Sequence, residues 1–297
     1  MLKRKLSLFV VGFFLLLPIL AEGQAQGGGG STRTATGGGD VGGAFSAMDS
    51  AIAEEEDLNA MDEYYLGRAV AANILSVYRP YTRSPELTAY LNRICQTIAV
   101  NSPQPEIFNG YHVIIMDSSE YNAFATPGGH ILVTRGLVEA AASEDMLAAV
   151  IAHELAHILL KHGVSIVADM RLNDALTSTA DRAGQLAARE SQSAARAALF
   201  RNSVTKMVDV MVKNGYSQAQ EFEADNAAMT LLAASGYNPG ALLEVLRILQ
   251  RTQSSQRGGF ASTHPSPAAR ISNAEGRVSR YRIQDTSSHR VSRFRNK

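Results

Sequence analysis

The chain has 297 residues, and 45% of them are hydrophobic, which is enough for one large domain or two smaller ones. Its 28 basic and 28 acidic side chains give a formal net charge of zero, which argues against a general nucleic-acid-binding protein. The single cysteine, Cys95, falls within an apolar helical pattern, and we expect it to be buried rather than reactive. An exported protein without a disulfide framework is typical of a bacterial periplasm.

The first 23 residues have the pattern of a secretory signal peptide. Basic residues at positions 3–5 precede the apolar stretch Leu6–Leu20, and Ala21-Glu22-Gly23 offers small residues for a cleavage site. Because this stretch is short for a membrane span, we expect cleavage, with an uncleaved signal anchor as the alternative. Residues 24–43 are rich in Gly, Ser and Thr and predict a flexible linker before the folded domain, residues 44–276.

The N-terminal half of that domain predicts helices and a small sheet. Residues 45–78 and 85–100 have helical apolar spacing, and the second stretch has Ser84 as its N-cap and Pro85 at its first position. Three short stretches predict a sheet of about three strands: 111–116, 121–126 and 130–134. Pro127-Gly128-Gly129 would join the last two as a hairpin. A helix is expected from about Leu137, and Ser143 caps the next one.

The C-terminal half predicts further helices around one ambiguous segment. Residues 163–214 are rich in Ala, Arg, Ser and Gln, and predict helix at both ends with an unassigned middle at 181–195. This segment is either an exposed helical hairpin or a lid over the active-site cleft. Helices are expected at 217–235, with Gly236 as the C′ residue, at 240–253, and from about Pro267.

The last residues, 277–297, form a basic tail. They carry seven basic side chains against one acidic side chain. The tail is either a solvated, partly disordered segment or a patch that contacts phospholipid headgroups or an acidic partner.

A metal-binding motif lies in the helix that Ser143 caps. His153, Glu154 and His157 match the zinc-protease pattern H-E-x-x-H. Residues four apart share one face of a helix, so both imidazoles point the same way, and Glu154 lies about 100° round the helix, within reach of a metal-bound water. The alternative is an amphipathic helix whose two histidines bind no metal.

A catalytic zinc site needs a third protein ligand and an open position for water. Glu221 and Asp225 share one face of the helix at 217–235, whereas Glu223 points away. One of the two carboxylates can bind the metal while the other accepts the ring N–H of a ligand histidine. The alternative is that these acidic residues only favour the first turn of a helix. Two imidazoles and one carboxylate favour zinc over cobalt or manganese.

These motifs resemble the zinc peptidase family that includes the HtpX-type membrane heat-shock proteases and the CAAX prenyl proteases, and most closely its periplasmic, signal-peptide-bearing branch. The matching stretches, in family order, are Asn122–Ala125, Pro127–Gly129, Thr134–Leu137, His153–His157, Glu221–Asp225, His264-Pro265 and Arg270-Ile271. The resemblance implies a mostly helical α+β, gluzincin-like fold with a small sheet beside the H-E-x-x-H helix. The chain lacks the membrane spans of the HtpX-type and prenyl-protease members, which argues against a membrane-embedded substrate.

The resemblance also assigns roles. It implies that His153, His157 and Glu221 bind one Zn²⁺, that Glu154 is the general base, and that Asp225 holds a ligand histidine. We expect the strand with Asn122, Ala123, Phe124 and Ala125 to hold an extended substrate by main-chain pairing. His264 is either an oxyanion stabiliser or a removable fourth ligand that keeps the enzyme latent, with a purely structural loop histidine as the alternative. The other histidines are expected to be structural: His112, His130, His162 and His289. On a helix continued from His157, His162 would lie about 140° from the ligand face.

The predicted function is that of a zinc endopeptidase of the periplasm. Zinc would lower the pKa of its bound water to about 7, and Glu154 would take the proton and return it to the leaving amine. Misfolded or stalled envelope proteins are the substrates that the resemblance implies. The alternative is a chaperone-like assembly adaptor with a closed zinc site, but the intact Glu154 argues against an inactive protein.

Overall fold

The computed structural model describes residues 59–168, 190–252, 263–264, 267–281 and 288–295. The predicted signal peptide and linker, residues 1–43, lie outside the described residues, as does the start of the first predicted helix. The elements, in chain order, are α2 (Ala60–Val77), α3 (Pro85–Ala99), β1 (His112–Met116), β2 (Ala123–Thr126), β3 (His130–Thr134), α4 (Arg135–Ala140), α5 (Glu144–Leu159), α7 (Glu190–Asp209), the π-helix η2 (Val210–Asn214), α8 (Gln218–Ala234), α9 (Ala241–Thr252), α11 (Pro267–Val278) and α12 (Ser288–Arg295).

The mostly helical α+β fold and the three-stranded sheet are confirmed. β2 and β3 form the predicted antiparallel hairpin, with Ala123 opposite Val133. Its turn uses Gly128 and Gly129, at φ 72° and 98°, a backbone region that side chains other than glycine seldom adopt. β1 runs parallel to β3, so the strand order is β1-β3-β2 and β2 is an edge strand.

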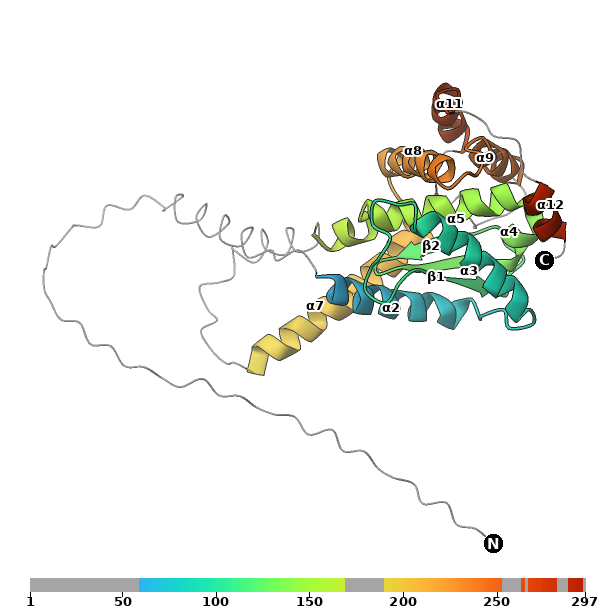
Figure 1. Cartoon of the computed structure of the whole chain (residues 1–297). Helices are drawn as coiled ribbons and strands as arrows, with labels where there is room; N and C mark the ends of the chain where they lie inside the picture. The colour runs from blue at the N-terminus through green and yellow to red at the C-terminus, as the bar shows by residue number, and fades with distance from the viewer. Residues whose placement is uncertain (1–58, 169–189, 253–262, 265–266, 282–287, 296–297) are drawn as a thin grey trace, which may run out of the picture. The chain divides into compact units, whose positions relative to one another are not determined.

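Both faces of this small sheet are buried, because successive side chains of each strand enter different cores. Ile131 and Val133 of β3 pack into the cluster that contains the apolar residues of α3 and α5. Leu132, between them in sequence, packs into the second cluster with residues of α2 and α7. The sheet is therefore the middle layer of the fold, as Figure 1 shows.

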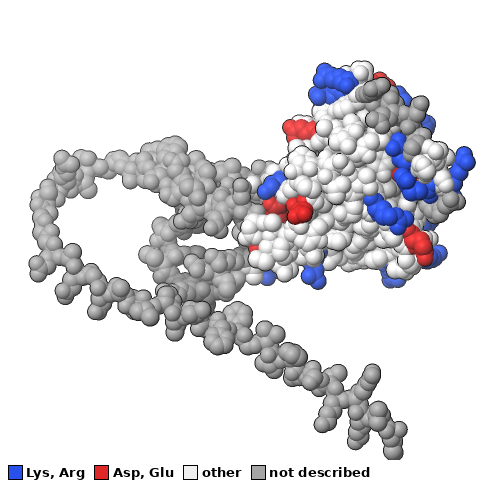
Figure 2. Space-filling model, viewed as in Figure 1, with Lys and Arg blue, Asp and Glu red and all other residues white. Residues whose placement is uncertain are grey.

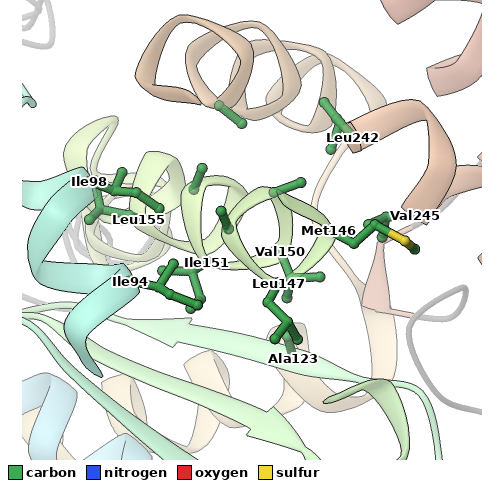
Figure 3. Close-up of a cluster of buried hydrophobic side chains, with 14 of the residues drawn as sticks. Ile94, Ile98, Ala123, Met146, Leu147, Val150, Ile151, Leu155, Leu242 and Val245 are labelled. Atoms are coloured by element: carbon green, nitrogen blue, oxygen red, sulfur yellow. The ribbon is translucent and has the colours of Figure 1, made fainter. Parts of the chain in front are cut away.

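The helix that carries the H-E-x-x-H motif lies at the centre of the larger core. The Ser143 hydroxyl accepts a hydrogen bond from the amide of Met146, which confirms the predicted N-cap. The side chains of α5 pack against α3, β2 and α9 on different sides, as the apolar contacts in Figure 3 show. Among the described residues, Glu144–Ala168 is the one helical stretch that passes a length and composition test for a membrane span, and 67% of its test window is buried, as expected of a core helix.

The C-terminal helices α8 and α9 cover the side of α5 that faces away from the sheet, and α11 packs on both of them (Figure 1). α8 begins with a capping box, in which Ser217 and Gln220 each accept a hydrogen bond from the other's backbone amide. Gly236 follows α8 at φ 75°, as predicted for its C′ residue. This contact between α8 and α5 brings the two predicted ligand motifs together.

The ambiguous segment at 163–214 is only partly described. Residues 162–168 are helical, 169–189 lie outside the described residues, and α7 begins at Glu190. α7 packs along α2, and its Val204 and Met207 belong to the second core, together with Met211 of η2. This part of the segment is therefore not an exposed hairpin. The lid hypothesis remains a prediction for residues 169–189, which lie outside the described residues.

Part of the basic tail is folded against the body. The Arg293 guanidinium donates two hydrogen bonds to the Glu144 carboxylate, at 3.0 and 2.6 Å. Arg290 forms an ion pair of 3.4 Å with Asp145. The two acidic residues of the first turn of α5 thus bind two of the tail's arginines, and Figure 2 shows basic side chains on the flank where α12 lies.

The tight contact of α2 with the hairpin turn generates a stability prediction. A Cβ atom at Gly67 would lie 1.7 Å from the Pro127 carbonyl oxygen, so α2 or the turn would have to move. We expect Gly67→Ala to lower the free energy of unfolding by about 1–3 kcal/mol, despite the higher helix propensity of alanine. Gly276→Ala in α11 is the matched control, because nothing lies within 4 Å of its Cβ, and it should gain about 0.5–1 kcal/mol. Urea unfolding measures both values, and equal effects of the two changes would contradict the packing argument.

Candidate metal centre

Four side chains from three parts of the chain converge at the contact of α5 and α8. The donor atoms of His153, His157, Glu221 and His264 all lie within 4.8 Å of one another, and all four side chains are buried. The two histidines come from α5 and the glutamate from α8. His264 comes from the segment before α11, so the structure brings the predicted ligands and the uncertain histidine into one group.

The distances within this group fit a tetrahedral zinc ion. Ligand atoms about 2.0–2.1 Å from zinc lie about 3.3–3.4 Å from one another in a tetrahedron. The His153 and His157 Nε2 atoms are 3.1 Å apart, and each is 3.5 Å from a different oxygen of Glu221. The His264 Nδ1 is 3.3 Å from the His153 Nε2 and 2.9 Å from the Glu221 Oε1. The donor set, three imidazoles and a carboxylate, is one that zinc accepts.

His153 is held by the predicted carboxylate. Its Nδ1 lies 3.1 Å from Asp225 Oδ1, so the ring proton is at Nδ1 and the Nε2 lone pair faces the donor group. Arg270, which belongs to the matching stretches but had no predicted role, lies beside both carboxylates. Its guanidinium donates two hydrogen bonds to Asp225, at 2.8 and 2.6 Å, and forms an ion pair of 2.8 Å with Glu221.

Charge compensation decides the protonation of this buried group. Burial alone would raise the pKa of both carboxyls, but His264 and Arg270 hold the pKa of Glu221 well below its usual range, and Arg270 lowers that of Asp225. Burial and Arg270 act to lower the pKa of His153, but its bonds to Asp225 and Glu221 raise it to about 9. Burial lowers the pKa of His157 to about 3, so this imidazole is neutral, as a metal ligand must be.

Glu154 lies beside the donor group without joining it. Its side chain is fully buried, and neither carboxylate oxygen has a hydrogen-bond partner among the described residues. Its Oε1 is 3.7 Å from the His264 Nε2, and burial raises the pKa of the carboxyl. A buried carboxyl without a partner is costly and needs an explanation, and a catalytic role is one that fits.

The position of His264 is set by contacts of the residue before it. The Thr263 hydroxyl donates to the Asn122 side-chain oxygen at 3.1 Å, and the Thr263 carbonyl accepts from the Tyr216 amide at 3.2 Å. The Tyr216 ring also stacks on His157, with centroids 4.3 Å apart. Sequence reasoning missed Thr263 and Tyr216, because neither belongs to a motif with a chemical signature.

The strand expected to hold substrate is closed in this structure. Asn122, Ala123, Phe124 and Ala125 are all buried, with at most 4% exposure, although β2 is an edge strand. Asn122, which belongs to the same stretch, is bound to Thr263. Thr263, the neighbour of the donor His264, therefore also contacts the start of this strand.

Three of the histidines predicted to be structural lie away from the donor group, whereas His162 contacts one of its members. The His112 Nε2 contacts the Asn109 carbonyl, His130 packs on Tyr64, and His289 is exposed on α12. The His162 Nδ1, in contrast, lies 2.9 Å from the His157 Nδ1. The helical-wheel argument that placed His162 away from the ligands is wrong, because α5 ends before it: Lys161 has a φ of 55° and the helix does not continue.

Comparison with known proteins agrees with this geometry. The family model for peptidase family M48 matches residues 83–278, which is more than half of the chain. The chain belongs to this family. The match includes the sheet and all four donor residues, so the metallopeptidase fold and the predicted family are confirmed.

Several curated proteins are similar to the chain. They include the beta-barrel assembly-enhancing protease of Escherichia coli O157:H7, 29% identical over 68% of this chain and 41% of that protein. The mitochondrial metalloendopeptidase OMA1 of Schizosaccharomyces pombe is 29% identical over 63% of this chain and 52% of that protein. The metalloprotease LoiP of Escherichia coli is 27% identical over 54% of this chain and 60% of that protein. The chain spans only part of each of these relatives.

The role of Arg270 in charge compensation gives a second prediction. Removing its charge leaves Glu221 and Asp225 buried without their guanidinium partner, so Arg270→Met should lower the free energy of unfolding of the metal-free protein by about 3–5 kcal/mol. Arg247→Met is the control, because Arg247 and its partner Glu275 have side chains that are 48% and 51% exposed, and such pairs contribute about 1 kcal/mol or less. Urea unfolding in a chelator measures both variants, and a loss at Arg270 no larger than at Arg247 would refute this role.

Proposed function

We propose that this member of peptidase family M48 is a zinc-dependent endopeptidase. The observation that carries the proposal is the carboxylate of Glu154, which has no hydrogen-bond partner among the described residues and lies beside a buried group of donors whose spacing fits one zinc ion. A structural zinc site needs ligands but no base, so Glu154 distinguishes a catalytic site from a structural one. Bound zinc supplies Lewis-acid chemistry, which acidifies water and polarises a peptide carbonyl.

Glu154 is the general base of this mechanism. Its raised pKa and its place on α5, one residue from the ligand His153, suit it to accept a proton from the attacking water. The same carboxyl then returns the proton to the leaving amine. Asp225 and Arg270 hold His153 throughout, since their hydrogen bonds fix its ring orientation.

His264 keeps the resting site closed. A catalytic zinc site has three protein ligands and one open position, whereas four donors converge here. His264 is then a removable fourth ligand, held through the contact of Thr263 with Asn122. Movement of this loop would open the fourth position and free the start of β2, where an extended substrate could pair with the strand edge.

The setting of the activity is part of the proposal. The N-terminal signal pattern favours a periplasmic protein, and similar proteins are named for beta-barrel assembly, so envelope polypeptides that are misfolded or stalled are the proposed substrates. Arg295 of α12 is exposed and available to a membrane surface, whereas Arg290 and Arg293 are bound to α5.

Variants of the general base Glu154 and of the fourth donor His264 have opposite expected effects on the cleavage rate. Glu154→Gln should keep zinc but lose about 10²–10⁴-fold in cleavage rate of an unfolded protein such as casein. Glu139→Gln is the matched control, since Glu139 is 59% exposed and binds Arg135 on α4, and it should cleave like the wild type. His264→Ala should cleave faster than the wild type, because its fourth position is open. Zinc content and casein cleavage of the four proteins are measured in parallel.

Other outcomes lead to other functions. A His264→Ala protein that binds zinc but does not cleave casein would make His264 an oxyanion stabiliser rather than a removable fourth ligand. The four-donor group also fits an envelope assembly adaptor with a permanently closed zinc site. That function is favoured if the wild type and His264→Ala bind zinc and neither cleaves any polypeptide.

A further inference from the structure

The second ligand histidine has a hydrogen-bond partner of its own. The His157 Nε2 faces the donor group, 3.1 Å from the His153 Nε2, while its Nδ1 lies 2.9 Å from the His162 Nδ1. An imidazole that binds a metal through Nε2 carries its proton at Nδ1. The His157 Nδ1 therefore donates, and the His162 Nδ1 must accept.

This contact sets the tautomer of His162 in turn. A neutral imidazole that accepts at Nδ1 carries its proton at Nε2. The His162 Nε2 lies 3.3 Å from Glu223 Oε2, and a carboxylate is an acceptor. The three side chains form a chain of hydrogen bonds in one direction, from His157 through His162 to Glu223.

The backbone holds His162 in this position. α5 ends at Leu159, and the left-handed conformation of Lys161 starts a new helical segment that turns His162 back toward His157. The Ser165 hydroxyl donates to the His162 carbonyl at 2.8 Å, and the Gln220 amide of α8 donates to that hydroxyl at 3.5 Å. His162 itself is 4% exposed, so its ring has little freedom.

We propose that His162 and Glu223 are positioning residues for the metal ligand His157. They fix its tautomer and ring orientation, as Asp225 and Arg270 do for His153. Each histidine of the H-E-x-x-H motif then has a separate support that leads to α8. The two supports differ in exposure, because Asp225 is fully buried whereas the Glu223 side chain is 62% exposed.

The inference rests on the proposed zinc site and is tested by zinc affinity, which needs no cleavage. Partners of metal ligands of this kind typically change metal affinity by about 10–100-fold when removed. His162→Phe keeps a flat ring but has no acceptor, so its zinc Kd should rise by about 10–100-fold in competition with a chromophoric chelator. His130→Phe is the matched control, since His130 is also buried but packs on Tyr64, and its zinc Kd should not change.

Two amide variants separate positioning from packing. The side-chain oxygen of asparagine is attached to Cγ, as Nδ1 of histidine is, whereas that of glutamine is one bond farther out. His162→Asn should therefore restore the zinc Kd to within about 3-fold of the wild type, and His162→Gln should restore less. Glu223→Ala should weaken binding by less than His162→Phe, since the carboxylate is partly solvated.

The results distinguish failure of this inference from failure of the zinc site. A wild-type zinc Kd that His162→Phe leaves unchanged would overturn the inference and leave the zinc site standing. Equal weakening in His162→Phe and His162→Asn, with an equal loss of stability in the metal-free proteins, would make His162 a packing residue and overturn it also. A wild-type chain that binds no zinc would overturn the proposed function itself.

Discussion

The metal centre depends on the burial of two carboxylates against one guanidinium. Glu221 and Asp225 have no exposed surface, and Arg270 lies between α8 and α11 with 1% exposure. Isolated buried charges are costly, so this arrangement is stable only if all three groups keep their contacts. The same contacts place one carboxylate among the donors and the other on the ring of His153. Charge compensation and ligand placement are therefore one feature of the structure.

The surrounding fold makes this feature rigid. α5 is buried against the sheet, α3, α8 and α9, so it cannot rotate to move its two histidines without breaking several apolar contacts. Packing against α8 brings the carboxylates to the same point. The fourth donor, His264, comes instead from the segment before α11, where Thr263 binds Asn122 and Tyr216 and His264 contacts Glu221 and His153. A centre with three donors on packed helices and one on a separate segment is a suitable arrangement for a site that opens.

The sequence predicted most of this site because its chemistry follows a local period. His153, Glu154 and His157 on α5, and Glu221 and Asp225 on α8, are positioned by helical spacing within a single element, which a sequence shows directly. The helices, the hairpin with its Gly128-Gly129 turn and the caps at Ser84 and Ser143 have equally local signals, and the structure confirms them.

The site residues that sequence reasoning missed or misplaced reach the site through tertiary contacts, or follow a break in the helical periodicity. His162 was misplaced because a single left-handed residue, Lys161, interrupts the helix that the periodic argument extended. Arg270, Tyr216 and Thr263 reach the site from distant parts of the chain, and nothing in their own sequence neighbourhood gives their partners. The burial of β2 is also invisible to sequence, because it depends on the packing of this strand against α2 and α5.

The most direct test of the central claim is X-ray absorption spectroscopy at the zinc edge on the zinc-loaded, resting full-length protein. The account predicts one zinc per chain with four nitrogen or oxygen neighbours at about 2.0–2.1 Å and the scattering pattern of three imidazoles. In His264→Ala protein, that pattern should fall to two imidazoles. A resting site with two imidazoles that His264→Ala does not change would contradict the convergence of four donors on one metal, and a wild-type protein without stoichiometric zinc would contradict the site as a whole.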